Sequence, residues 1–190
     1  MPATGTYTVL LEPFYGATWE GQLLLDPGTV LSVDGAMPTL GGASVGEPLR
    51  FRFDASAGQR LNIGLSGFAY AAPSANATVL TLYRPDGTSL GSVSCYTSGS
   101  GSCEWSSAGL PASGTYSMVV APPAASEIGA GTLALSTPLA GAFIVGDPPQ
   151  AVAITRPGQT ARFTFSGNAA QLLRLAWTSP VTSGGAGVAV

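Results

Sequence analysis

The side chains that could do chemistry in this chain are carboxylates and two cysteines, because the chain has no histidine and its seven basic residues are all arginines. Mechanisms that pair serine or cysteine with histidine or lysine are therefore excluded. Glycosidase chemistry would need two facing carboxylates. The ten carboxylates are Glu12, Glu20, Asp26, Asp34, Glu47, Asp54, Asp86, Glu104, Glu127 and Asp147. Most of them lie beside turn residues, so we expect no catalytic residues and no enzyme.

Calcium is the metal that such carboxylates could bind, and it needs six to eight oxygen ligands. Asp26, Asp34 and Glu47 are the nearest candidates, yet no D-x-D-x-D-G sequence is present. Asp-Pro-Gly at 26–28 and Asp-Gly at 34–35 are also ordinary turn signals. Zinc is disfavoured by the lack of histidine. We expect no bound metal and no cofactor, with calcium kept as the alternative.

The two cysteines, Cys95 and Cys103, are predicted to form a disulfide. They stand eight positions apart in "SCYTSGSGSCEW", so they would face each other if this segment were a β-hairpin with residues 97–102 at its tip. The alternative is two free thiols in a cytosolic protein, but no metal or redox spacing such as C-x-x-C is present. A disulfide would indicate an oxidising compartment.

Aromatic residues provide the tentative ligand surface. Phe14, Tyr15 and Trp19 lie in one predicted loop, "EPFYGATWEG", and exposed rings are a common way to hold sugars and polymers. The alternative is that these rings cover the boundary with an adjacent repeat.

The composition favours an all-β fold. Gly and Pro are frequent (26 and 15 residues) and separate short runs of β-branched and aromatic residues, which is typical of many short strands with turns. Strict alternation in Arg50-Phe51-Arg52-Phe53 predicts phenylalanines in the core and arginines in solvent. "RPDGTSL" at 84–90 predicts a hairpin around Asp-Gly.

Several segments occur twice. "TGTYTVLLEP" at 4–13 matches "SGTYSMVVAP" at 113–122, and "GQLLLD" at 21–26 matches "GTLALS" at 131–136. The segment 46–66 matches 158–178, so that Phe51 and Phe53 correspond to Phe163 and Phe165. A period of about 110 residues suits a whole β-sandwich. Tyr7 and Tyr116, which both follow Gly-Thr, are predicted to form tyrosine corners.

The repeat predicts a division of the chain into tandem jelly-roll or immunoglobulin-like antiparallel β-sandwiches. Residues 1–26 would be the C-terminal hairpin of a preceding repeat, and residues 113–136 the equivalent last hairpin of the complete one. Residues 27–45 would be an inter-repeat segment, 46–136 the complete sandwich, 137–149 a linker, and 150–190 the N-terminal strands of a following, truncated repeat.

The order of these motifs resembles the bacterial pre-peptidase C-terminal domain. The motifs are F-x-F, then A-x-A-G-Q-x-L-x-I, an L-x-L-Y-x-P-D-G hairpin, and G-T-Y-x-V-V followed by G-x-L-x-L-S, over about residues 46–136. The resemblance implies a jelly-roll-like, non-catalytic module of secreted bacterial proteins, which often occurs in tandem and in some cases binds collagen or carbohydrate. The segment with the two cysteines is similar to versions in large surface proteins, including those with Rhs/YD repeats.

Charge and hydropathy narrow the classes of partner that the chain could bind. The net charge is −3 with no basic cluster, so we expect no nucleic acid. No apolar run approaches about 18–20 residues, so we expect no membrane insertion. The opening "MPATGTY" lacks the features of a signal peptide, and Met1 matches an ordinary internal position of the second copy. We expect a piece of a longer exported protein, extracellular or at the cell surface.

These observations predict an extracellular structural or adhesion module without enzymatic activity. The incomplete repeats at the two ends are predicted to complete each other by strand addition, which between chains would give head-to-tail filaments. Self-association and contacts with neighbouring repeats are therefore the expected interactions. The alternative is a carbohydrate- or protein-binding module of a secreted enzyme or toxin, with polysaccharide or an extracellular protein as its ligand.

Overall fold

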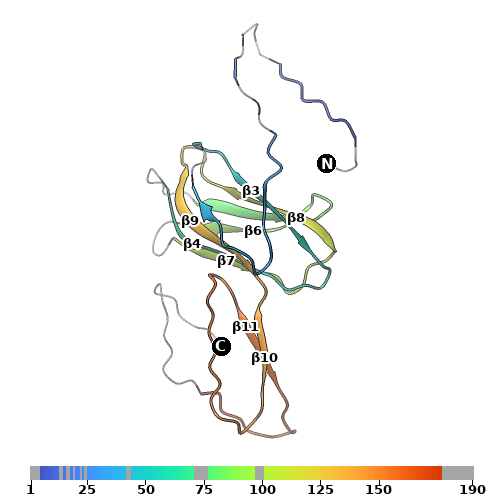
Figure 1. Ribbon diagram of the computed structural model, residues 1–190, viewed down its shortest axis with the longest axis vertical. Coiled ribbons are helices and arrows are strands. Elements are labelled where there is room, and N and C mark those ends of the chain that lie inside the picture. Colours follow the sequence, from blue (N-terminus) through green and yellow to red (C-terminus); the bar gives the residue numbers. More distant parts are fainter. Residues whose placement is uncertain are drawn as a thin grey trace.

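The structure is a computed structural model that describes residues 5–12, 15, 18, 20–21, 23, 25–41, 44–70, 77–96 and 101–176 (Figure 1). These residues form eleven strands, β1 to β11. Within them, no helix is long and apolar enough to cross a membrane.

Two sheets pack face to face as a sandwich, which confirms the predicted all-β fold. The five-stranded sheet has the order β1 (Thr29–Val30), β3 (Leu49–Ala55), β8 (Gly114–Ala121), β5 (Thr78–Tyr83) and β6 (Ser89–Cys95). The four-stranded sheet has the order β2 (Thr39–Leu40), β9 (Ile128–Ser136), β4 (Asn62–Tyr70) and β7 (Cys103–Ser106). Thus β1 and β2, from the segment predicted to lie between repeats, are edge strands of the sandwich.

The predicted facing of β3 is confirmed. Phe51 and Phe53 are buried, whereas Arg50 and Arg52 are exposed. Phe53 stacks on Tyr116 of the neighbouring strand β8, with ring centroids 5.7 Å apart. The Tyr116 hydroxyl donates a hydrogen bond of 2.8 Å to the carbonyl oxygen of Ala112, so the tyrosine corner predicted at this residue is also present.

The hairpin predicted at Asp86-Gly87 joins β5 to β6. Gly87 has a φ of 84°, a left-handed conformation that glycine adopts at little cost. The hydroxyl of Thr88 donates a hydrogen bond to the Asp86 carboxylate, as does the Thr88 amide. These bonds favour the charged form and hold the pKa of Asp86 below its ordinary value.

Two other predicted hairpins are wrong. Cys95 ends β6 and Cys103 begins β7, but β6 is an edge of the five-stranded sheet and β7 an edge of the four-stranded one. Likewise β8 and β9, the predicted last hairpin at 113–136, belong to different sheets. Both connections cross between sheets, because β6 pairs with β5 and β8 with β3 and β5 in one sheet, whereas β7 pairs with β4 and β9 with β2 and β4 in the other. That residues 1–26 form the closing hairpin of a preceding repeat stays a prediction.

Outside the sandwich, β10 (Leu139–Phe143) and β11 (Ala161–Phe165) form a separate two-stranded parallel sheet. In Figure 1 this sheet lies on the opposite side of the sandwich from the N-terminal segment. The described residues before Thr29 are irregular and form no strand.

Candidate functional site: the disulfide edge and the junction

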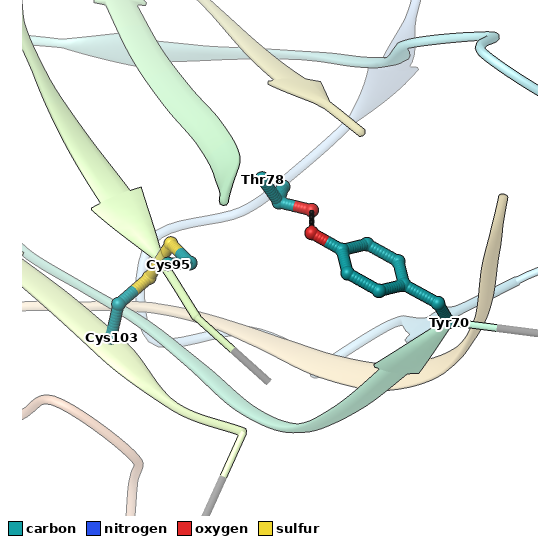
Figure 2. The surroundings of a disulfide bond; sticks show 4 residues. All are labelled: Tyr70, Thr78, Cys95 and Cys103. Atoms are coloured by element: carbon teal, nitrogen blue, oxygen red, sulfur yellow. Dashed lines mark hydrogen bonds between the residues drawn. A yellow bond between two sulfur atoms is a disulfide. The ribbon is translucent and has the colours of Figure 1, made fainter. Parts of the chain in front are cut away.

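The predicted disulfide between Cys95 and Cys103 is present, with Cα atoms 5.2 Å apart. It joins the outer edges of the two sheets. Figure 2 shows a second link beside it, from the Tyr70 hydroxyl of β4 to the Thr78 hydroxyl of β5, 2.9 Å apart. A covalent bond and a hydrogen bond therefore link the two sheets on this side.

The outer face of β4 and β9 carries a patch of small residues. Asn62 is paired with Ser136 and Gly64 with Ala134 across the two strands. Strand alternation places these four residues on the face away from the core, yet all four are buried. In the alternating sequence Leu61-Asn62-Ile63, Asn62 takes the face away from the core and would be expected in solvent. It is buried because another segment of the chain covers this patch.

The covering segment is the loop 156–160, which precedes β11. A Cβ atom on Gly64 would overlap the carbonyl of Pro157, and one on Gly158 would overlap the backbone of Gly64. Asn62 donates a 3.0 Å hydrogen bond from its amide nitrogen to the Thr160 hydroxyl, which in turn donates to the Asn62 amide oxygen at 2.9 Å. Glycine at position 64 thus allows the loop to lie directly on the sheet, and Thr160 satisfies the buried asparagine.

Arg156 fixes the start of this loop. Its Nη2 donates hydrogen bonds to the carbonyl oxygens of Gly35 at 2.7 Å and Leu135 at 3.2 Å, and its Nη1 donates to that of Asp34 at 3.4 Å. Its buried Nε has no partner among the described residues. A single guanidinium therefore binds the turn after β1 and the end of β9 at once.

Asp34 ties the same two regions from the other side. Its carboxylate accepts hydrogen bonds from the amide of Thr137 at 2.9 Å and from the Thr137 hydroxyl at 2.7 Å. The side-chain amide of Gln159 donates to the Thr137 carbonyl at 2.8 Å. We call this contact the junction. It consists of the loop 156–160 together with Thr137, the Asp34-Gly35 turn and the small-residue patch. No local sequence signal identified it, because its partners are up to 122 residues apart.

The strands on the two sides of the junction have the same geometry. In the sandwich, β1 pairs in parallel with β3, and Thr29 lies opposite Phe51. In the small sheet, β10 pairs in parallel with β11, and Gly141 lies opposite Phe163. Both pairings are related by the offset of 112 that relates the two sequences.

Three turns recur at the same offset. The first joins residues 32 and 35, and again 144 and 147; the second joins 44 and 47, and again 156 and 159; the third joins 56 and 59, and again 168 and 171. In the third, Gln59 and Gln171 each accept a 2.9 Å hydrogen bond on Oε1 from the amide three residues earlier. Ala170 even has the left-handed φ (61°) of its counterpart Gly58 (77°), although a Cβ makes that conformation less favourable.

Of the tentative ligand surface, only Tyr15 lies within the described residues, and it is fully exposed. Phe14 and Trp19 lie outside the described residues. That these three rings form a ligand surface therefore stays a prediction.

The three carboxylates considered for calcium are engaged in hydrogen bonds. Asp26 accepts from the amide of Gly28 at 2.7 Å and Glu47 from that of Ser44 at 3.0 Å, as expected of turns. Asp34 is the exception, since it bonds Thr137 across the junction. Within the described ranges no three cysteine or acidic residues gather as a metal site would require.

Residues 49–122, from β3 to just beyond β8, match the family model of the bacterial pre-peptidase C-terminal domain. The resemblance drawn from the motifs is thereby confirmed for this part of the chain.

The chain is also similar to solved structures. The periplasmic inhibitor of g-type lysozyme PliG from Aeromonas hydrophila is 23% identical, with 57% of this chain and 94% of that chain covered and a TM-score of 0.38. The pre-peptidase C-terminal domain of collagenase from Bacillus anthracis is 9% identical, with 60% and 99% covered and a TM-score of 0.38. A comparison with curated proteins found no match.

Proposed function

We propose that this chain is a non-enzymatic structural or adhesion module of an exported protein, in which β-sandwiches follow one another and are held at fixed angles by the junction. The observation that carries this proposal is the recurrence, at an offset of 112, of the parallel strand pair and of three turns. A strand register and hydrogen-bonded turns that repeat together support a second unit beginning after β9. Residues 156–160 of that unit lie on the first one.

The lack of catalytic chemistry supports a structural role. The chain has neither histidine nor lysine, and at the junction the side chains of Arg156 and Gln159 donate their hydrogen bonds to backbone carbonyls. The match to the pre-peptidase C-terminal family, whose resemblance implies a non-catalytic module, points the same way.

The disulfide supports an extracellular or cell-surface location. Disulfides persist in oxidising environments and are rare in the cytosol. Cys95 is fully buried and Cys103 is packed against the core, so the bond belongs to the folded sandwich and is not an exposed, exchangeable pair.

Arg156→Ala is expected to free the small sheet from the sandwich. The change leaves the carbonyls of Gly35 and Leu135 without this donor, and hydrogen bonds to a charged group contribute about 1.5–3 kcal/mol. The measurement is ¹⁵N relaxation by NMR: residues 139–165 should tumble with the sandwich in the wild type and faster than it in the variant.

Arg162→Ala is the matched control, because Arg162 is an exposed arginine of β11 outside the junction. Gly64→Ala is a second test, since the three atoms nearest to its methyl group would all belong to Pro157 and Gly158 of the loop; it should free the small sheet while the sandwich stays folded. Independent tumbling of residues 139–165 in the wild type would contradict a fixed junction.

The alternative, a carbohydrate- or protein-binding module, is favoured by the full exposure of Tyr15 in the predicted ring cluster. If the rings bind a polymer, titration with polysaccharides or collagen should give a saturable change in tryptophan fluorescence that is lost in Trp19→Ala. A response kept by that variant would have to come from Trp105 or Trp177 and would count against this surface.

A further inference from the structure

Two buried polar atoms of the junction have no hydrogen-bond partner among the described residues. One is Oγ of Ser136, at the end of β9, and the other is Nε of Arg156, in the loop 156–160. Within the described part of the chain, they are the only buried side-chain nitrogen or oxygen atoms of this kind. Buried polar groups are almost always satisfied by protein atoms or by ordered water. Because both exceptions belong to one contact, we look for a single cause.

Both atoms lie where the loop meets the end of β9. Nη2 of Arg156 donates to the carbonyl oxygen of Leu135 at 3.2 Å, and Ser136 is the next residue of the strand. Ser136 is opposite Asn62 in the register of β9 and β4, so the two residues share the outer face that the loop covers. Ser136 is 0% exposed, so its hydroxyl is out of reach of the bulk solvent.

The neighbouring side chains are engaged with other partners. The two Nη atoms of Arg156 donate to backbone carbonyls. The side-chain amide of Asn62 and the hydroxyl of Thr160 bond each other twice. These bonds hold the loop on the sheet, but they include neither Oγ of Ser136 nor Nε of Arg156.

The chemistry of the two atoms and their surroundings identifies the missing partner. Nε of an arginine can only donate a hydrogen bond, whereas a serine hydroxyl can both donate and accept. The charge of the guanidinium disfavours a cation here, and the carbonyl oxygens of Gly35 and Leu135, which bind the same guanidinium, disfavour an anion. The ligand that fits is a small neutral molecule with both donors and acceptors, and water has these properties.

We propose that one water molecule is bound inside the junction, where it accepts a hydrogen bond from Nε of Arg156 and shares a second with the hydroxyl of Ser136. Buried waters make about three hydrogen bonds. Asn62 can supply the third, since Thr160 uses one of the two hydrogens on its amide nitrogen. The water thus links the loop to β9 and β4, and it gives the buried hydroxyl of Ser136 a role in the contact.

NMR of the whole chain tests for this water. A ¹⁵N-edited rotating-frame spectrum should show a direct Overhauser cross-peak between water and the Nε–H proton of Arg156. Chemical exchange with water gives a peak of the opposite sign in this experiment, so the two contributions are separable. Ser136→Ala removes one partner of the water and should abolish the direct cross-peak.

The stability of the same variant gives a second readout. If the hydroxyl of Ser136 binds the water, Ser136→Ala removes a hydrogen bond and should lower the denaturant midpoint. If the hydroxyl is buried without a partner, the same change removes an unsatisfied group and should raise the midpoint. Ser106→Ala is the matched control, because Ser106 lies opposite Asn62 on the other side but is exposed; it should leave the cross-peak and the midpoint unchanged.

Three results would overturn the proposal. They are the lack of a direct cross-peak in the wild type, a cross-peak that Ser136→Ala leaves at full strength, and a midpoint that Ser136→Ala raises. This inference concerns the contact itself and holds whether or not the residues after β9 begin a second unit. The relaxation of residues 139–165 tests the proposed function separately, because a fixed junction does not require a bound water.

Discussion

Phe53→Ala is expected to lower the free energy of unfolding by about 3–5 kcal/mol, the range for truncating a buried phenylalanine. Phe53 is almost completely buried and stacks on Tyr116. The change removes the ring from a core shared by both sheets and leaves a cavity beside Tyr116. Denaturant midpoints, with the slope of unfolding checked for constancy, are the measurement.

Two variants of the same chain serve as controls. Phe165→Ala removes the same side chain from β11, at the position that corresponds to Phe53 by the offset of 112 and where it is exposed, so it should change the midpoint of the sandwich little. Arg52→Ala removes an exposed neighbour of Phe53 and should also cost little. If Arg52→Ala were as damaging as Phe53→Ala, the facing of β3 would be inverted.

Opening the disulfide is expected to lower the free energy of unfolding by about 2.5 kcal/mol, since a closed loop this short constrains the unfolded chain only moderately. Titration of the unfolded, unreduced protein should find no thiol. Reduction by dithiothreitol should then lower the denaturant midpoint without abolishing folding, because the packing of the apolar core does not require the covalent bond.

Tyr70→Phe provides the comparison, because it removes the neighbouring hydrogen bond between the sheets and should cost about 1 kcal/mol. Two reactive thiols in the unreduced protein would falsify the bond itself. A reduced protein that no longer folds would mean that the edge of the sandwich depends on the covalent link.

Local patterns were enough to predict the facing of β3, the Asp86-Gly87 turn and the Tyr116 corner, because in each case the deciding contacts lie within the strand or within a few residues. The sheet to which a strand belongs was not predictable in this way. Cysteines eight residues apart can be bridged in a hairpin or across two sheet edges, since both geometries bring their Cα atoms within about 4.4–6.8 Å.

The junction was not predictable from the sequence for the same physical reason, because its contacts join segments that are distant in the chain. The Asp34-Gly35 sequence predicts a turn, and Asp34 does lie in a turn with a φ of 59°, but its carboxylate accepts hydrogen bonds from Thr137. Gly64 and Asn62 belong to a strand with an ordinary alternating pattern. The distant loop 156–160 explains both residues, because it leaves no room for a Cβ atom at position 64 and supplies a hydrogen-bond partner for the buried amide of Asn62. Exposed rings such as Tyr15 carry no local signal of what they contact.

The bond between Asp34 and Thr137 has a mechanical consequence. The chain enters the sandwich at Thr29 and leaves it at Thr137. Hydrogen bonds of Asp34 and Arg156 join these two ends of the sandwich, although about a hundred residues separate them in the sequence. If units of this kind follow one another as proposed, tension along the row would load these few hydrogen bonds at the contact first. The core and the disulfide edge would carry load only after those bonds break.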